Sequence, residues 1–304
     1  MAKVSVIIPT HRRPHLLPRA VQSALRAGTD VEVIVVDDAS TDSTANVCRQ
    51  LQGIRYIRLE NNLGVAGARN VGILASSADY IAFLDDDDLR LPGSLDYQLE
   101  ALSKNEAAGF VCGPMLIADH DGNLTGEVSA PKSAGGDVFW ELLELGLPVL
   151  PISVVVRKKC FTPVGMLRHD LSGIDDWDMF VRIAELFQVV VVDQPVSIYT
   201  KPTPSSGQGS SAQSQHLRRA ARHQLQLLRL PRARRASSSR KRRARKLALN
   251  RIADTLLKNA VMGICESSYS YACRNTLAAL RLSPLQALRP TNYKKVASTL
   301  LHRR

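Results

Sequence analysis

The first 200 residues alternate apolar, β-branched runs with amphipathic segments, and this alternation limits the fold more than any other feature of the sequence. Runs typical of strands occupy residues 3–9, 31–36, 54–59 and 80–84. Helical spacing of apolar residues occupies residues 15–27, 41–51 and 65–75, and another helix is expected from Pro92 to about Lys104. Strands that alternate with helices in this way form right-handed βαβ units around a parallel sheet. We therefore predict an α/β fold.

The regular alternation of predicted strands and helices ends at about residue 108. Phe110–Ala118 followed by the turn Asp121-Gly122-Asn123 is typical of an antiparallel hairpin. Further helices are expected at residues 138–145 and 176–187, and further strands at residues 152–156 and 189–192. The predicted sheet is therefore mixed, mainly parallel and flanked by helices.

The charge of the chain changes sharply near residue 200. Residues 1–200 contain 17 Lys/Arg and 26 Asp/Glu, whereas residues 201–304 contain 23 Lys/Arg and 2 Asp/Glu, which gives a net charge of +12. One fold rarely spreads charge so unevenly. Residues 202–215 are rich in Pro, Ser, Gly and Gln, as linkers are. We predict an acidic α/β domain over residues 1–200, a flexible linker over 201–215 and a basic, helical C-terminal extension over 216–304.

Polar residues follow three of the predicted strands at the point where each strand ends. Pro9-Thr10-His11 ends the first strand, Asp37-Asp38 the second, and four aspartates, residues 85–88, the fourth. Open α/β sheets bind ligands at the carboxyl ends of their strands, so these residues are expected to share one cleft. No glycine-rich phosphate loop of the dinucleotide or P-loop type follows any strand.

The four consecutive aspartates repel one another, and desolvation in a cleft increases that cost. A hard divalent cation such as Mg²⁺ or Mn²⁺ removes the conflict, because it prefers carboxylate and phosphate oxygens. Alternate residues of an extended segment point the same way, so Asp85 and Asp87 are candidates to face one ion. The alternative is a solvated acidic turn in which Asp86 or Asp88 caps the helix after Pro92.

Asp38 is a candidate for nucleotide recognition. A carboxylate here can accept hydrogen bonds from the imide N–H of a uracil or thymine, or from ribose hydroxyls. The alternative is that Asp38, Ser40 and Thr41 form only a turn and a helix N-cap.

A fourth acidic segment, Asp175-Asp176-Trp177-Asp178, begins a predicted helix and places acids at the positive end of its dipole. One of these carboxylates can serve as a general base, and Trp177 can offer a flat apolar face to a sugar ring. The alternative is a capped amphipathic helix with Trp177 in the core.

Together these segments resemble the family 2 inverting glycosyltransferases, which have the GT-A fold. Five blocks in the family's order and spacing carry the resemblance over about residues 3–200, namely residues 4–10, 35–42, 62–70, 83–88 and 175–178. The resemblance implies an enzyme that moves a sugar from a nucleotide-diphosphate donor to an acceptor hydroxyl and inverts the anomeric carbon.

The resemblance also implies a donor site. Pro9 and Thr10 match the loop that touches the nucleotide base, and Asp38 matches the carboxylate that recognises it. Arg69 lies where the family has a basic side chain near the base or the diphosphate. Asp86 is expected with these donor-binding residues.

The same resemblance assigns the metal, the base and the acceptor side. Asp85 and Asp87 match the metal-binding DxD pair, with Mg²⁺ or Mn²⁺ as the cofactor. Asp176 matches the catalytic base, with Asp175 as a competing candidate. Asp175 and Trp177 are expected on the acceptor side.

The basic extension contains the run 229–246, which is rich in Arg and Lys and has no acid. After it, Leu247, Leu249, Ile252, Leu256, Ala260 and Ile264 recur at about helical spacing. Such a region, residues 229–264, can dock on an anionic inner-membrane surface or pack on the acidic domain, and both alternatives stay open. Nucleic acid is a poor candidate partner, since the basic run has no aromatic residue for stacking.

The partners expected from these observations are a UDP-, GDP- or dTDP-linked sugar and a glycan or lipid-linked acceptor in cell-surface polysaccharide or lipopolysaccharide biosynthesis. No signal peptide is recognisable at residues 1–8, so we expect a cytoplasmic protein, with the inner face of the plasma membrane as a possible docking surface. Two rival functions are a sugar nucleotidyltransferase and a non-catalytic membrane- or nucleic-acid-binding module. The loop after the first strand lacks the glycines that a sugar nucleotidyltransferase needs to bind phosphate. The presence of Asp85, Asp87 and Asp176 disfavours a non-catalytic binding module.

Overall fold

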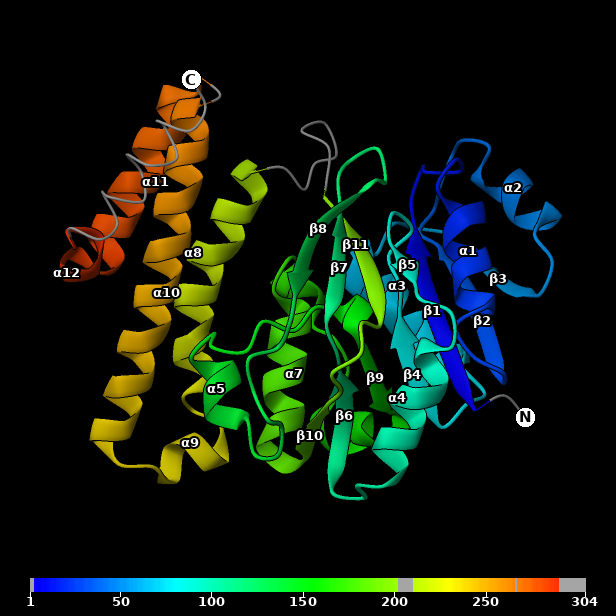
Figure 1. Cartoon of the computed structure of the whole chain (residues 1–304), viewed down its shortest axis with the longest axis horizontal. Coiled ribbons are helices and arrows are strands. Elements are labelled where there is room, and N and C mark those ends of the chain that lie inside the picture. The colour runs from blue at the N-terminus through cyan, green and yellow to red at the C-terminus, as the bar shows by residue number, and fades with distance from the viewer. Residues whose placement is uncertain (1–2, 202–209, 266, 290–304) are drawn as a thin grey trace. The chain divides into compact units, whose positions relative to one another are not determined.

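The computed structural model describes residues 3–201, 210–265 and 267–289, and the chain forms two compact units (Figure 1). Unit 1 comprises residues 1–139 and 147–201, and unit 2 comprises residues 140–146 and 202–304. The predicted linker over 201–215 lies partly outside the described residues. From Ser210 onwards it is helical instead, and no proline or glycine follows Gly209 there to break a helix.

The main sheet of unit 1 has seven strands in the order β10-β6-β9-β4-β1-β2-β3. Their bounds are β1 (Val4–Thr10), β2 (Val31–Asp37), β3 (Ile54–Arg58), β4 (Tyr80–Phe83), β6 (Ala108–Cys112), β9 (Val154–Arg157) and β10 (Gln188–Val191). Only β9 runs antiparallel to its neighbours, β4 and β6. The mixed, mainly parallel sheet expected from the sequence is confirmed.

A second sheet of four strands, in the order β5-β11-β7-β8, also belongs to unit 1. It consists of β5 (Leu89–Arg90), β7 (Met115–Ala118), β8 (Leu124–Ser129) and β11 (Ser197–Thr200). The predicted antiparallel hairpin is formed by β7 and β8, whereas β6 joins the main sheet. The sequence did not predict β5 or β11, because strands of two and four residues leave little periodicity to detect.

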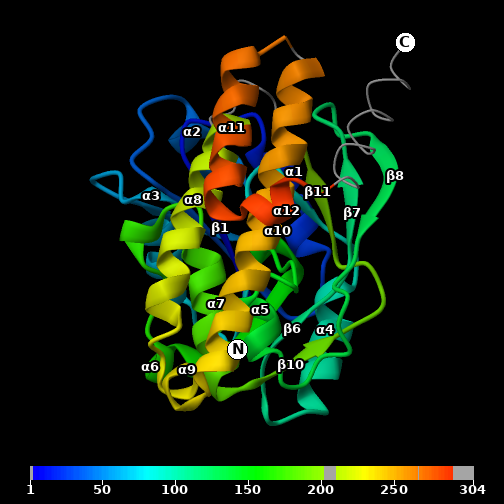
Figure 2. The same cartoon turned by 90° about the vertical axis from the view of Figure 1, so that its left-hand side faces the viewer.

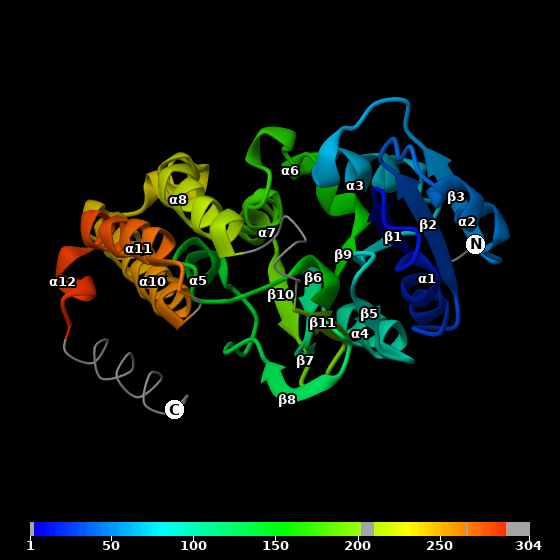
Figure 3. The ribbon, with the colours of Figure 1, turned by 90° about the horizontal axis from the view of Figure 1, so that it is seen from above.

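Helices cover both faces of the main sheet. The helices of unit 1 are α1 (Leu17–Leu25), α2 (Thr44–Gln50), α3 (Gly64–Ala75), α4 (Ser94–Ser103), α6 (Phe161–Val164) and α7 (Asp175–Leu186), with 3-10 turns at Pro151–Ser153, Lys158–Cys160 and His169–Leu171. Helix α5 (Phe139–Leu143) begins at the last residue of a unit 1 segment and continues into unit 2. Helices α1 and α3 lie on opposite faces of the β1–β2 region (Figure 3).

Helix α1 packs on the sheet through large apolar side chains, whereas α3 packs through a close approach of its backbone. On one face, α1 buries Leu17 and Val21 against the strand side chains of the core. On the other, Gly72 of α3 approaches β1 so closely that a Cβ there would lie 2.4 Å from Cγ2 of Ile7. This close approach fixes α3, and with it Arg69 and Asn70, against the central strand.

Unit 2 is helical and consists of α8 (Ser210–Leu227), α9 (Pro231–Arg235), α10 (Ser238–Cys265), α11 (Tyr269–Leu282) and α12 (Pro284–Ala287), together with residues 140–146. Helix α10 packs against both α8 and α11 (Figure 2). Ile252, Leu256 and Ala260 of the predicted amphipathic pattern are buried in α10, whereas Ile264 is exposed. None of the helices in the described part of the chain is long and apolar enough to cross a bilayer.

Candidate active site

Three strand ends meet at one edge of the main sheet. Thr10, the last residue of β1, is in register with Asp37 of β2, and the Asp38 N–H donates a hydrogen bond to the Thr10 carbonyl over 2.9 Å. Next to them, the Leu84 N–H at the end of β4 donates to the carbonyl of Ile7 over 3.0 Å. This edge therefore carries Pro9, Thr10, Asp38 and the four aspartates that follow Leu84.

Asp86 and Asp87 are tied to the loop after β1. The Thr10 hydroxyl donates to Asp86 over 2.7 Å, and Nη1 of Arg13 contacts Asp86 at 3.1 Å and Asp87 at 3.0 Å. Burial raises the pKa of Asp86 to about 6, against the opposing effect of Arg13. Burial and the neighbouring Asp85 carboxylate also raise the pKa of Asp87. Asp86, expected among the donor-binding residues, is therefore nearly enclosed by protein groups.

Arg69 joins the aspartates after β4 to those of α7. Its Nη2 lies 2.5 Å from Oδ1 of Asp85, and its Nη1 lies 3.8 Å from Oδ2 of Asp175. Arg69 is 5% exposed, and its Cζ lies 5.7 Å from the ring centroid of Phe83. A charge so deeply buried needs partners, and two carboxylates from distant segments supply them. Asp85 and the start of α7 are thereby drawn together across about 90 residues of sequence.

The first turn of α7 holds the candidate base. Burial, followed by the adjacent Asp175 carboxylate, raises the pKa of Asp176 to about 6, while Arg69 acts in the opposite direction. Burial also raises the pKa of Asp175. Trp177 is partly buried. The structure thus places Asp175, Asp176 and Trp177 on one helical turn beside Arg69.

The two aspartates after β2 have different surroundings. Asp37 is fully buried and accepts hydrogen bonds from the Tyr56 hydroxyl at 2.7 Å and the Ser40 N–H at 2.9 Å. Asp38 accepts one from the Leu63 N–H at 2.7 Å through Oδ1, and its Oδ2 has no protein hydrogen-bond partner in the described structure. Asp37 therefore stabilises the turn, whereas one carboxylate oxygen of Asp38 has no hydrogen bond within the described residues.

The capping alternatives for the acidic segments are wrong. Helix α4 begins after Gly93 with no side-chain cap, so neither Asp86 nor Asp88 caps it. Asp88 instead accepts a hydrogen bond from the Thr200 N–H over 2.7 Å. Helix α2 begins at Thr44, after Ser43, so Asp38 does not cap it either.

Several side chains that support the site were missed by the sequence reasoning. Asn70 exchanges two hydrogen bonds with the backbone of Leu167, at 2.8 and 3.1 Å, and so connects α3 to the segment before α7. Arg182 pairs with Asp178 at 2.8 Å and donates to the carbonyls of residues 164–166. The spacing of four residues between Asp178 and Arg182 was a readable signal, whereas nothing in the sequence identified Leu167 as a partner of Asn70.

Tyr199 of β11 is also near the acidic cluster. Burial raises the pKa of Tyr199 to about 12, with further contributions from Asp88, Asp87 and Asp85. Because β11 was not expected, this residue could not be assigned to the site from the sequence.

The charges of the cleft do not balance within unit 1. Six carboxylates (Asp85, Asp86, Asp87, Asp88, Asp175 and Asp176) share two guanidinium groups, those of Arg13 and Arg69. Their oxygens are the donors that Mg²⁺ and Mn²⁺ prefer, so the residues fit a hard divalent cation. In the described residues, however, no three His, Cys, Asp or Glu side chains are already arranged to hold a metal ion.

The mixed sheet with flanking helices and carboxylates at the carboxyl ends of its strands has a GT-A-like α/β fold. In accordance with this, the fold matches the mannosyltransferase of Pyrobaculum calidifontis in complex with GDP-Man and Mn²⁺, with a TM-score of 0.62 at 17% identity over 98% of this chain and 80% of that one. Residues 5–139 match the sequence family described as Glycosyl transferase family 2. This match covers the sheet strands β1 to β4 and the four aspartates after β4, so this part of the chain is similar to that family.

Two curated relatives place the family match in context. The GalNAc(5)-diNAcBac-PP-undecaprenol beta-1,3-glucosyltransferase of Campylobacter jejuni is 38% identical over 135 residues, which are 42% of this chain and 43% of that protein. A putative teichuronic acid biosynthesis glycosyltransferase of Bacillus subtilis is 34% identical over 135 residues, or 43% of this chain and 54% of that protein. The chain spans about half or less of the length of most of the curated relatives that it matches.

Proposed function

We propose that this chain transfers a hexosyl group from a nucleotide-diphosphate sugar to an acceptor hydroxyl and inverts the configuration of the anomeric carbon. The observation that carries the proposal is the position of Arg69, which contacts Asp85 after β4 at 2.5 Å and Asp175 of α7 at 3.8 Å. A donor-side carboxylate and the carboxylates of the candidate base thereby belong to one site. Such a site can hold the two substrates of a transfer reaction next to each other.

In this proposal Asp176 is the catalytic base. Its pKa of about 6 is close to the pH at which a base is both ionised and able to accept a proton. Asp176 takes the proton of the acceptor hydroxyl as that oxygen attacks the anomeric carbon from the face opposite the leaving diphosphate. A single displacement inverts the anomer and needs no covalent intermediate. Trp177 and Asp175, on the same turn, orient the acceptor.

The donor is held by the edge of the sheet. Asp38 uses its Oδ2 to accept a hydrogen bond from the base or the ribose, and Pro9 and Thr10 form the floor under the base. Asp85 and Asp87 hold Mg²⁺ or Mn²⁺, which when bound stabilises negative charge on the leaving diphosphate. Arg69 sits beside this pair, where its charge opposes the repulsion between Asp85 and the acids of α7.

A divalent cation is supported by the charge of the cleft. A diphosphate adds negative charge to a region where six carboxylates already exceed two guanidinium groups, so its binding requires a cation. The relative from Pyrobaculum calidifontis was solved with Mn²⁺ and GDP-Man, which supports the same requirement here.

For the substrates we propose a UDP-, GDP- or dTDP-linked hexose and a glycan or lipid-linked acceptor. The Campylobacter jejuni relative is described as acting on a diphosphate-undecaprenol-linked glycan, and the Bacillus subtilis relative is described as a putative enzyme of teichuronic acid biosynthesis. Both names support a role in the synthesis of a cell-surface polysaccharide or lipopolysaccharide. Work at the inner face of the plasma membrane, with the 229–264 region at its surface, is part of this proposal.

The test is a donor screen with the purified full chain. UDP-, GDP- and dTDP-hexoses are incubated with Mn²⁺, with Mg²⁺ or with EDTA, and release of the nucleoside diphosphate is measured. We expect slow, metal-dependent hydrolysis of the donors that carry one of these bases. Absence of both hydrolysis and donor binding for every donor in the presence of metal would overturn the proposal.

A further inference from the structure

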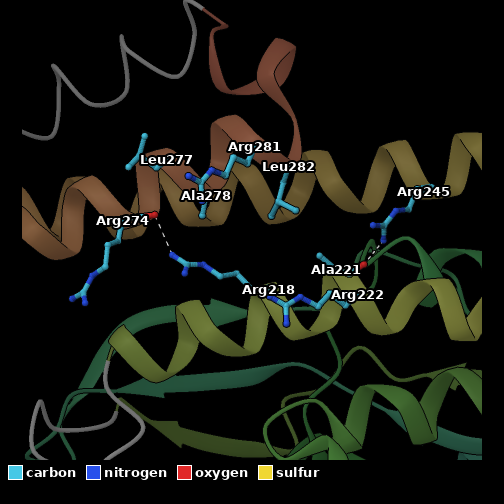
Figure 4. A pocket seen from close by; sticks show the side chains of 9 residues that line it. All are labelled: Arg218, Ala221, Arg222, Arg245, Arg274, Leu277, Ala278, Arg281 and Leu282. Carbon is cyan, nitrogen blue, oxygen red and sulfur yellow. Dashed lines mark hydrogen bonds between the residues drawn. The ribbon is translucent and has the colours of Figure 1, made fainter.

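A pocket of about 320 Å³ lies within unit 2, between α8, α10 and α11 (Figure 4). Its lining consists of five arginines and four apolar residues, namely Arg218, Arg222, Arg245, Arg274, Arg281, Ala221, Leu277, Ala278 and Leu282. The volume is at the lower end of the range for small-molecule sites, which is roughly 300–1,000 Å³. The pocket is unrelated to the acidic cleft of unit 1, because all of its residues belong to unit 2.

No carboxylate lines this pocket. Within the described structure none of the five arginines forms a salt bridge, and the acids described in unit 2 are Glu141, Glu144 and Asp254. Glu144 is paired with Arg240, and Asp254 accepts two hydrogen bonds from Gln286. Among the described residues of this unit, no carboxylate therefore offsets the positive charge of the pocket.

The arginines make few contacts with protein. Nη2 of Arg218 donates to the carbonyl of Arg274 over 3.1 Å, and Nε of Arg218 is buried without a hydrogen-bond partner in the described structure. Arg245 donates to the carbonyl of Ala221 (Figure 4). It also donates to Gln224 over 3.0 Å. Most of the donors of five guanidinium groups are thus available. A buried donor without an acceptor is costly, and a ligand with several acceptor oxygens would satisfy Arg218 together with the other arginines of the lining.

Phosphate chemistry fits these donors. Guanidinium groups bind phosphate oxygens in a bidentate, charge-assisted way, and two phosphates in series suit five arginines better than one carboxylate does. The apolar part of the lining adds a second requirement. Leu277, a lining residue on α11, is 48% exposed, and outside the lining Leu285 of α12 and Leu288, which follows it, are 81% and 59% exposed. A ligand with an apolar chain next to its phosphate would cover such side chains.

We propose that the pocket between α8, α10 and α11 binds the phosphate or diphosphate group of a lipid, with Leu277 and Leu282 in contact with the first carbons of its chain. The proposal does not depend on sugar transfer in unit 1. It also differs from docking of the whole 229–264 region on a charged membrane, because only Arg245 of the five arginines lies in that region.

The experiment uses the full chain in EDTA and isothermal titration with three probes: geranyl diphosphate, inorganic diphosphate and geraniol. We expect geranyl diphosphate to bind roughly tenfold more tightly than inorganic diphosphate, because burial of about two methylene groups has an effect of that size. Geraniol should show no binding. Equal affinity for geranyl diphosphate and inorganic diphosphate would overturn the lipid assignment in favour of a soluble phosphate compound.

Two double variants with the same change of charge separate the pocket from the overall basic character of the unit. Arg222→Gln with Arg281→Gln removes two exposed pocket arginines and should weaken binding of geranyl diphosphate at least tenfold. Arg242→Gln with Arg243→Gln removes two exposed arginines of α10 outside the pocket and should leave the affinity for geranyl diphosphate unchanged. An equal loss in both variants, or in neither, would contradict the proposal.

A single variant tests the apolar half of the site. Leu277→Gln should weaken the binding of geranyl diphosphate and leave the binding of inorganic diphosphate unchanged. Because Leu277 is exposed, the variant should fold. A Leu277→Gln variant that binds geranyl diphosphate like the wild type would refute contact with the chain. Donor hydrolysis by unit 1, measured on the pocket variant, should stay at the wild-type rate, so failure of the pocket proposal and failure of the proposed function give different results.

Discussion

In unit 1 the carboxylates of the cleft surround two arginines, whereas in unit 2 five arginines line a pocket that has no carboxylate. Arg69 and Arg13 each contact two aspartates, and in this way segments that are distant in sequence are joined. The pocket arginines contact only carbonyl and amide oxygens in the described structure. Arginine therefore joins distant segments of the chain in unit 1. In unit 2 we propose that arginines bind a ligand.

The difference also concerns what each region lacks. The acidic cleft has an excess of negative charge, and in the proposed function a cation offsets this charge when a diphosphate binds. The arginine pocket has an excess of positive charge and can accept a phosphate group directly. If both proposals hold, the two units bind phosphorylated molecules by opposite routes.

The largest effect is expected from the base of the cleft. Asp176→Asn should lower kcat for sugar transfer by about 10²–10⁴-fold, because Asn cannot accept the proton of the acceptor hydroxyl. Donor affinity, measured by titration of the nucleotide sugar with metal, should change little. Asp170→Asn, an exposed aspartate on the turn before α7, is the matched control and should keep wild-type kcat. A wild-type kcat for Asp176→Asn would remove Asp176 from the mechanism.

Arginine substitutions in the two units compare the regions directly. Arg69→Met should lower the free energy of unfolding by about 3–5 kcal/mol, since it leaves two partly or fully buried carboxylates without their cation. Arg222→Met, in the pocket of unit 2, should change it by no more than about 0.5 kcal/mol, as exposed and unpaired side chains usually do. Urea denaturation measures both values.

A further variant keeps this comparison informative if Arg69→Met does not fold. Arg69→Lys retains the charge but not the geometry of two separate contacts, and should recover part of the lost stability. If Arg69→Met and Arg222→Met had equal effects, the distinction between organising and ligand-binding arginines would be wrong.

The sequence was sufficient to predict which site residues lie at the ends of strands, because apolar runs mark the strands. Apolar runs ending in Thr10, Asp38 and Asp85 placed these residues at strand ends, and parallel pairing brought them to one edge. The fold and the family were therefore predictable. Assignments of individual roles to Asp38, Asp85, Asp87 and Asp176 stay predictions, although the structure brings these side chains to one region.

The contacts between distant side chains were not predictable. Nothing in the spacing of the sequence indicated that Arg13 would bridge Asp86 and Asp87, because the direction of a side chain in a loop depends on backbone angles such as the positive φ of 57° at Arg12. The arginine pocket could not be predicted from the sequence either. Its residues come from three helices, and the sequence showed only that the region is basic and helical.

A smaller effect is expected for Arg13, which is less buried than Arg69. Arg13→Met should lower the free energy of unfolding by roughly 1–3 kcal/mol at pH 8, the usual worth of hydrogen bonds to charged groups. The folded pKa of Asp86 is raised to about 6, so its charged form weakens the fold increasingly as the pH rises from about 4 through 6. At pH 5 Asp86 is largely protonated in the folded protein, and the loss on removal of Arg13 should be smaller. Urea denaturation at both pH values measures this, and a loss that is larger at pH 5 would contradict the assignment.

The smallest effect is a shift in the pH profile. With Asp176 as the base, kcat should rise with pH and level off above the pKa of about 6. Asp175→Asn removes the neighbouring carboxylate that raises the pKa of Asp176, while Arg69, which lowers that pKa, stays in place, so the rise in kcat should move to lower pH. The profile of kcat against pH for the wild type and Asp175→Asn measures the shift, with Asp170→Asn as the control that leaves the profile unchanged. Loss of all activity in Asp175→Asn would instead identify Asp175 as the base, whereas a shift to higher pH would show that the acids of α7 do not interact as their positions indicate.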